Sequence, residues 1–344
     1  MRTGIPIIIA SFGLASLLTL AVPTLAQHGT TNGEWSTWAG DLGATRYAPL
    51  DHIHADNFDS LEVAWRFKTD NLGPSPDFNL QSTPLMIDGV LYTTAGSRRN
   101  VVALDAKTGE QLWMYRIDEE ERAEQSMRRL SGRGVGYWTD GSSDERIYFV
   151  TIGYQLIALD AQTGRPVVDF GVNGIVDLKQ NNDQELDLIT SELAWNGAPV
   201  VAGNVVLVGA ASRAGGTPPS RQNAKGYVRG FDVRTGKRLW IFHTIPQPGE
   251  FGHDTWEDGF WEYTGNTGVW TQMTVDTELG IAYLPVEIPT GDYYGGHRPG
   301  DNLFAESLVA VDVNTGERIW HFQFVHHPIW DYDVPCAPIL ADIT

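Results

Sequence analysis

The stretch "VHHPIWDYDVP" (325–335) places two histidines, two aromatic residues and two aspartates within eight consecutive positions. Asp331 and Asp333 alternate with Trp330 and Tyr332. Carboxylates serve in proteins as proton acceptors and as ligands of hard cations, so the stretch is a candidate for either chemistry. The alternative is a pair of turn aspartates. In an extended backbone, residues two apart point to one face, so we expect the two carboxylates to lie together.

A short pattern that occurs four times indicates the scaffold behind this stretch. Two alternating apolar segments flank Asp-x-x-Thr-Gly, which predicts a β-hairpin whose Asp bonds the turn backbone and whose Gly takes a positive φ. Trp113, Trp240 and Trp320 follow at one equivalent place, where the second copy has Val168. The copies are "VVALDAKTGEQLWMY" (101–115), "LIALDAQTGRPVVDF" (156–170), "VRGFDVRTGKRLWIF" (228–242) and "LVAVDVNTGERIWHF" (308–322).

A second repeat precedes the first and completes a four-stranded unit. It reads "STPLMIDGVLYTTA" (82–95) and "GAPVVAGNVVLVGA" (197–210), each a strand, a turn and a strand. Repeated four-stranded units predict an all-β protein, a β-propeller; a β-sandwich is the alternative. "CAPIL" (336–340) restates the opening of this second repeat. We therefore expect an incomplete N-terminal portion of a propeller, with about four to five blades.

The N-terminus and the charge indicate the compartment and exclude some partners. Arg2, an apolar run over 5–22 and Thr-Leu-Ala before Gln27 predict a cleaved signal peptide at 1–26; a membrane anchor is the alternative. The mature chain, 27–344, is then periplasmic or secreted, with no transmembrane segment. Its formal charge would be −20, since removing Arg2 takes one positive charge from −19. Such acidity argues against nucleic acid as a partner. Cys336 is the only cysteine, which excludes an intrachain disulfide.

The Asp-x-x-Thr-Gly-x-x-x-Trp repeat resembles the tryptophan-docking motif of quinoprotein dehydrogenases, which are eight-bladed propellers that bind pyrroloquinoline quinone (PQQ). The resemblance runs from residue 35 to the last residue. "SGRGVGYWTDG" (131–141), "GDYYGGHRPGDNLFAESLVAVD" (291–312) and "VHHPIWDYDVP" are similar to the branch of membrane glucose dehydrogenase and its soluble relatives.

This resemblance implies an exported dehydrogenase that oxidises an alcohol or sugar hydroxyl by hydride transfer to PQQ and passes electrons to a quinone or to cytochrome c. The alternative is a non-catalytic propeller of the outer-membrane assembly type, which carries the same docking repeats.

The resemblance also implies which residues hold the cofactor. Trp270 matches the flat floor under PQQ, with a blade-packing tryptophan as the alternative. Arg133 matches an arginine that bonds the quinone side, and Thr151 a hydroxyl that reaches a PQQ carboxylate. These two are otherwise a surface charge and an ordinary strand threonine. Gln81 stands where many relatives carry Glu. Arg129 stands near the place of a vicinal disulfide or a histidine over the cofactor.

Asp331 matches the catalytic aspartate, which takes the substrate hydroxyl proton as hydride leaves. The metal site departs from the family pattern, because the expected Asn falls on Ile288 and "GAASRAGG" (209–216) holds no Glu. Asp333 and Glu287 are the oxygen donors that could join Asp331 as metal ligands. We expect calcium or magnesium, and a lanthanide is not excluded.

A further family element is a Lys or Arg in the following blade that contacts the quinone oxygens. It would lie beyond residue 344, so we expect the chain alone to be inactive.

Overall fold

The computed structural model describes residues 29–212 and 220–341, which form four four-stranded antiparallel sheets. The first sheet contains β1 (Leu85–Ile87), β2 (Val90–Ala95), β3 (Asn100–Asp105) and β4 (Gln111–Tyr115). The second contains β5 (Gly136–Thr139), β6 (Glu145–Val150), β7 (Gln155–Asp160) and β8 (Ile175–Asp177). The third contains β9 (Val200–Ala202), β10 (Val205–Val208), β11 (Val228–Asp232) and β12 (Arg238–Phe242). The fourth contains β13 (Thr274–Asp276), β14 (Ile281–Val286), β15 (Ser307–Asp312) and β16 (Arg318–Gln323).

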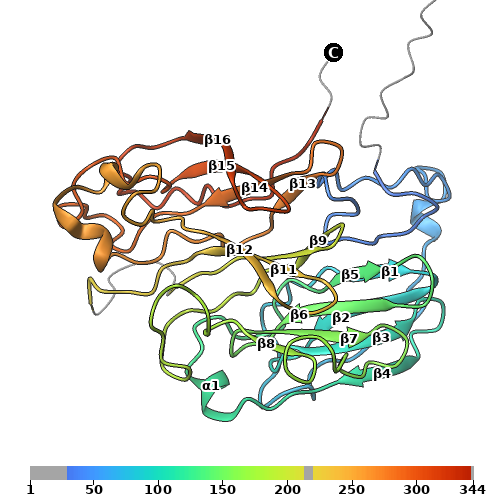
Figure 1. Cartoon of the computed structure of the whole chain (residues 1–344). Coiled ribbons are helices and arrows are strands. Elements are labelled where there is room, and N and C mark those ends of the chain that lie inside the picture. The colour runs from blue at the N-terminus through green and yellow to red at the C-terminus, as the bar shows by residue number, and fades with distance from the viewer. Residues whose placement is uncertain (1–28, 213–219, 342–344) are drawn as a thin grey trace, which may run out of the picture.

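In every sheet the strands pair in chain order, so each sheet is a meander that one contiguous segment forms. Figure 1 shows the sheets following one another from the cyan and green strands to the orange and red ones. Short helices lie only outside the sheets: η1 (Phe58–Ser60), α1 (Glu120–Glu124), η2 (His253–Thr255) and η3 (Glu257–Glu262). This is the architecture of a β-propeller with part of its blades, as the repeats predict.

The repeated turn forms as predicted. In the first sheet, Asp105 Oδ1 accepts hydrogen bonds from the backbone N–H of Lys107 (3.0 Å) and from the N–H (2.7 Å) and hydroxyl (2.8 Å) of Thr108. Gly109 follows with φ +73°. Asp160, Asp232 and Asp312 bond their own turns in the same way.

Two tryptophans of the repeat join the first sheet to the second and the third sheet to the fourth. Trp113 Nε1 donates to the carbonyl of Ala161 (2.9 Å) in the second sheet, and Trp240 Nε1 donates to the carbonyl of Val313 (3.0 Å) in the fourth. The indole of Trp240 covers Gly316, where an added Cβ would lie 2.6 Å from the ring. The glycine therefore serves the close approach as well as the turn. Trp320, on β16, is 40% exposed, since the described residues contain no repeat after it.

The second sheet departs from the predicted hairpin over 156–170. The residues after Gly164 form only an isolated bridge at Pro166, and β8 lies further along, at Ile175–Asp177. Proline has no N–H to donate to the ladder, so the chain loops out before it pairs. Phe170, which is fully buried, contacts the position of Gly236 on the third sheet, where a docking tryptophan would otherwise lie.

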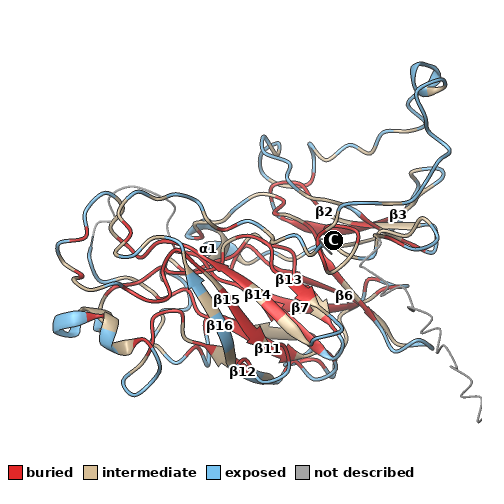
Figure 2. Cartoon of the chain, turned by 90° about the horizontal axis from the view of Figure 1, so that it is seen from above, coloured by how far each residue is buried: buried red, intermediate tan, exposed pale blue. Residues whose placement is uncertain are grey.

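The buried residues gather in the strands, as Figure 2 shows for β7, β11 and β14, whereas the outermost strand β16 is largely exposed. One apolar cluster runs through the second, third and fourth sheets. Among the described residues, no helix has the length and apolar character needed to span a bilayer. The predicted signal peptide, 1–26, lies outside the described residues.

Candidate active site

The segments that lead into the innermost strands bond one another across the sheets. The N–H of Thr83, ahead of β1, donates to the carbonyl of Arg133 (3.1 Å), ahead of β5. The N–H of Arg133 donates in turn to the carbonyl of Asn196 (2.9 Å), ahead of β9. Trp195 Nε1 then donates to the carbonyl of Val269 (2.8 Å), ahead of β13. This chain of bonds brings together segments that are far apart in sequence and carry two of the predicted site residues, Arg133 and Trp270.

Arg133 and Trp270 meet side chain to side chain. The guanidinium carbon of Arg133 lies 5.0 Å from the centroid of the Trp270 ring. Arg133 Nη1 is buried and has no hydrogen-bond partner within the described residues. Burial lowers the pKa of Arg133, and the nearby cation of Arg128 adds to the effect. A flat aromatic surface beside a cation with an unused donor fits a planar, anionic ligand such as PQQ.

Asp331 lies near other carboxylates, and its surroundings raise its pKa. Burial raises its pKa, and the carboxylates of Asp292 and Asp333 raise it further. The expected extended backbone is wrong: Asp331 and Asp333 have φ +50° and +51°, in the left-handed region. Trp330 and Tyr332 are 60% and 64% exposed, so neither covers Asp331 from water in the described structure.

Two buried glutamates stand near this aspartate, and only one of them was anticipated. Burial raises the pKa of Glu287 to about 8, with Asp331 and Asp292 contributing and Arg128 opposing. Burial raises the pKa of Glu306 to about 7, and Asp331 and Asp333 add to it. Glu287 Oε1 and Glu306 Oε2 are buried without a hydrogen-bond partner in the part of the chain described. The candidate site therefore contains a group of carboxylates, those of Asp331 and the two glutamates among them, that interact electrostatically with one another.

The metal prediction concerns Asp331, Asp333 and Glu287. Within residues 29–212 and 220–341, no three His, Cys, Asp or Glu side chains are grouped so that they could hold an ion. The assignment of these three residues as metal ligands stays a prediction. The left-handed backbone at both aspartates removes the alternation on which their common face depended.

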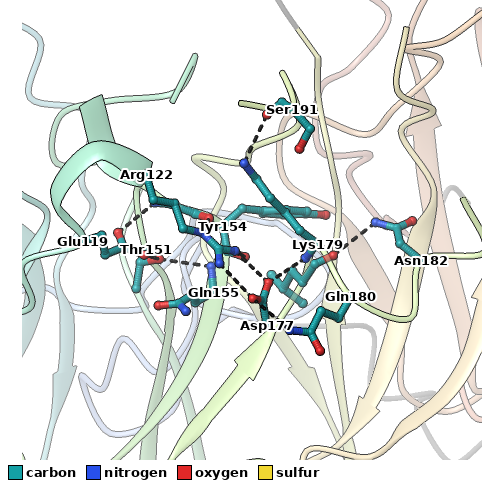
Figure 3. Close-up of polar contacts among 12 residues, drawn as sticks. Glu119, Arg122, Thr151, Tyr154, Gln155, Asp177, Lys179, Gln180, Asn182 and Ser191 are labelled. Carbon is teal, nitrogen blue, oxygen red and sulfur yellow. Dashed lines mark hydrogen bonds and ion pairs between the residues drawn. The ribbon is translucent and has the colours of Figure 1, made fainter. Parts of the chain in front are cut away.

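Thr151 lies at the centre of a polar network that holds α1 (Figure 3). Its hydroxyl donates to Glu119 Oε1 (2.7 Å) and accepts from the N–H of Gln155 (3.0 Å). Arg122, on α1, forms a bidentate pair with Asp177 at 2.7 and 2.8 Å. The Thr151 hydroxyl would have to release Glu119 before it could donate to a cofactor carboxylate.

The remaining predicted cofactor residues are exposed. Arg129 is held by its own loop, where it donates to the carbonyls of Ser126 (3.2 Å) and Glu124. Gln81 is exposed, just ahead of the segment that reaches Arg133. The preceding arginine, Arg128, is the one whose charge interacts with Glu287 and Asp333. The sequence prediction named Arg129 and did not name Arg128. The two arginines are consecutive, so the pair could have indicated that either side chain reaches the site.

A cavity opens beside this loop. Its wall is formed by the loop residues 124–130, by Phe78 and its neighbours, and by the segment that ends at Asn196. Arg128 lines the cavity and also interacts with the acidic groups of the site. The cavity therefore adjoins the candidate site.

The fold and the site together define a β-propeller in which a cation–aromatic pair, Arg133 and Trp270, lies near a group of acids. The family model of the PQQ-dependent glucose/ethanol/alcohol dehydrogenase β-propeller domain matches residues 35–344. The chain belongs to this family.

Known relatives match the chain over most of its length. Quinoprotein glucose dehydrogenase A of Acinetobacter calcoaceticus is 30% identical over 92% of the chain, and the dehydrogenase subunit of the quinone alcohol dehydrogenase of Gluconobacter oxydans is 33% identical over 90%. The chain spans 41% and 40% of the lengths of these relatives. The crystal structure of quinohemoprotein alcohol dehydrogenase from Comamonas testosteroni superposes with a TM-score of 0.76 at 29% identity, over 90% of this chain and 44% of that one.

Proposed function

We propose that the chain is part of an exported PQQ-dependent dehydrogenase that oxidises an alcohol or sugar hydroxyl. The observation that carries this proposal is the contact between Arg133 and Trp270, with the unused Nη1 donor of Arg133. The family membership and the names of the relatives support the same activity.

In this proposal Trp270 is the floor of the cofactor site and Arg133 binds the quinone side of the cofactor. When bound, PQQ supplies a quinone carbon that accepts hydride. Gln81, Arg129 and Thr151 remain proposed contacts at the rim, of which Thr151 requires the rearrangement described above. The cavity beside the 124–130 loop is the proposed approach for the substrate.

Asp331 is the proposed general base. Its raised pKa makes it a stronger base than an ordinary aspartate once it is ionised. It would accept the proton of the substrate hydroxyl at a carboxylate oxygen. The neighbouring acids sustain that basicity, because each added negative charge favours the protonated form of Asp331.

Calcium or magnesium, with Asp331, Asp333 and Glu287 as ligands, stays a proposal that rests on the oxygen chemistry of these side chains. A periplasmic or secreted location is proposed from the signal-peptide pattern at 1–26. A quinone or cytochrome c as electron acceptor is proposed from the resemblance.

The test is turnover in the natural polypeptide that contains residues 1–344. The protein is reconstituted with PQQ, supplied with an artificial electron acceptor and offered a panel of alcohols and sugars, with calcium, magnesium or neither. We expect PQQ-dependent acceptor reduction with at least one substrate class. Asp56→Asn, at a fully solvated aspartate, is the matched control for Asp331→Asn. No acceptor reduction with any substrate and ion would refute the proposal.

A further inference from the structure

Arg99 is a buried cation whose hydrogen bonds all go to backbone carbonyls. It follows β2 and is 2% exposed. Its Nε donates to Leu130 (3.0 Å), its Nη1 to Val150 (3.1 Å), Thr151 (3.3 Å) and Trp195 (2.8 Å), and its Nη2 to Arg128 (2.7 Å) and Arg129 (3.4 Å). The planar fork of a guanidinium suits this arrangement, in which one side chain serves several acceptors at fixed angles.

These carbonyls belong to three segments of the candidate site. Arg128, Arg129 and Leu130 lie in the loop that leads to Arg133. Val150 and Thr151 end β6, at the network that holds α1 (Figure 3). Trp195 precedes Asn196, whose carbonyl bonds the N–H of Arg133. Arg99 therefore connects the first sheet to the loop that precedes Arg133 and to Trp195, the residue before the backbone partner of Arg133.

The loop takes a backbone conformation that needs such support. Leu130 has φ +71°, in the left-handed region that non-glycine residues rarely occupy. Such residues persist when their surroundings hold them in place, and the Leu130 carbonyl accepts the Arg99 Nε bond. At the next glycine, Gly132, a Cβ would lie 2.9 Å from Arg99 Nε. The loop thus passes directly over the guanidinium.

The charge of Arg99 is not neutralised by a direct ion pair. No carboxylate among the described residues lies within salt-bridge distance of it. Burial lowers its pKa to about 10, so it remains charged at neutral pH. Arg99, Arg128 and Arg133 are three guanidinium cations close enough to affect one another's pKa in turn, Arg133 acting on Arg99 and Arg128 on Arg133. The carboxylates of Glu119 and Asp77 act on Arg99 from a distance.

We propose that Arg99 is a positioning residue of the cofactor pocket. It fixes the 126–133 loop against β6 and the segment ahead of β9, and so determines where Arg133 lies over Trp270. The inference rests on the proposed function for its cofactor, but the hold on the loop can be tested without one.

The experiment compares three variants of the natural polypeptide. Arg99→Met removes the charge and the fork, and Arg99→Lys keeps the charge without the fork. Arg146→Met is the matched control, since Arg146 is also buried and donates to the carbonyls of Val233 (3.0 Å) and Arg234 (2.8 Å). One measurement is the rate of tryptic cleavage after Arg128 and Arg129 under native conditions. The other is the Kd for PQQ, normalised to the folded fraction.

We expect Arg99→Met to raise the cleavage rate about tenfold or more, because the loop opens more often. It should raise the PQQ Kd by about 10- to 100-fold, the usual cost of losing an outer supporting contact. Arg99→Lys should fall between wild type and Arg99→Met, and it carries the test if Arg99→Met does not fold. Arg146→Met should leave both measurements near wild type.

Unchanged cleavage in both Arg99 variants would overturn the inference, as would faster cleavage with an unchanged Kd. An equal effect of Arg146→Met on both measurements would also overturn it, because the role of Arg99 would then be general stability. Failure of the wild type to bind PQQ would refute the proposed function instead, and the cleavage rates would still decide whether Arg99 holds the loop.

Discussion

Trp240 and Trp320 occupy the same place in the repeat but differ in what lies next to them, and this difference sets a stability prediction. Trp240 is 6% exposed, donates to the carbonyl of Val313 and covers Gly316. Trp320 is 40% exposed and contacts the ring of Tyr283 at 5.9 Å. Replacing each by alanine therefore removes very different amounts of buried contact.

We expect Trp240→Ala to lower the free energy of unfolding by about 3–5 kcal/mol, as for other buried tryptophans. Trp240→Phe should cost about 1–3 kcal/mol, since it keeps the ring but leaves the Val313 carbonyl without its donor. Trp320→Ala should cost about 1 kcal/mol or less, because its side chain is already partly exposed and makes no hydrogen bond like that of Trp240 to Val313 in the described residues.

The assay is urea unfolding of a polypeptide that consists of this chain, the one in which Trp320 is 40% exposed. Unfolding is followed by far-ultraviolet circular dichroism, which the loss of one indole perturbs less than fluorescence. The ranking Trp240→Ala, Trp240→Phe, Trp320→Ala supports the docking account. Equal losses of unfolding free energy in Trp240→Ala and Trp320→Ala would refute the reasoning that a docking tryptophan stabilises the fold by packing on the repeat that follows it.

Further predictions concern the acids, a buried lysine and the metal. Asp331→Asn should lower turnover by about 10²- to 10⁴-fold at saturating substrate, whereas full turnover would remove the general-base role. Lys179 is 4% exposed and burial lowers its pKa to about 8. Between pH 8 and the ordinary lysine pKa, Lys179 binds more protons in the unfolded chain than in the folded one. The contribution of Lys179 to the free energy of unfolding therefore rises with pH over this range, by about 1–3 kcal/mol. Lys179→Met should lose this rise in urea unfolding at pH 7.5 and 10, and an unchanged pH dependence would contradict it. The proposed metal site of Asp331, Asp333 and Glu287 predicts that chelation abolishes activity. It also predicts that Asp333→Ala raises the calcium or magnesium concentration needed for half-maximal turnover. Undiminished turnover in the presence of chelator would exclude a metal ion from the reaction.

The local features of the fold could be predicted because local residues determine them. Asp105 and Gly109 form their turn through bonds within five residues, and that turn is recognisable wherever the pattern recurs. The second sheet shows the limit of this reasoning. Pro166 interrupts the ladder, and the pairing of β8 then depends on where the loop returns, which no pattern at 156–170 encodes.

The site could be predicted in part, for a related reason. The resemblance named Arg133 and Trp270, and the structure brings them together. It did not distinguish Arg128 from Arg129, because the two are adjacent in sequence and only the folded loop brings the charge of Arg128 near Glu287 and Asp333. Glu306 was missed because, directly ahead of β15, it resembles any polar residue that precedes a strand.

The most direct test of the central claim is an equilibrium titration of the natural polypeptide with PQQ, in wild type, Trp270→Phe and Trp270→Ala. Stacking on an aromatic ring contributes about 1–3 kcal/mol, so Trp270→Ala should weaken binding by about 5- to 150-fold. Trp270→Phe should retain most of the affinity, and circular dichroism should show both variants folded. Saturable wild-type binding that Trp270→Ala weakens in this range is the predicted result. Identical PQQ affinity in all three proteins, or no binding to wild type, would contradict it.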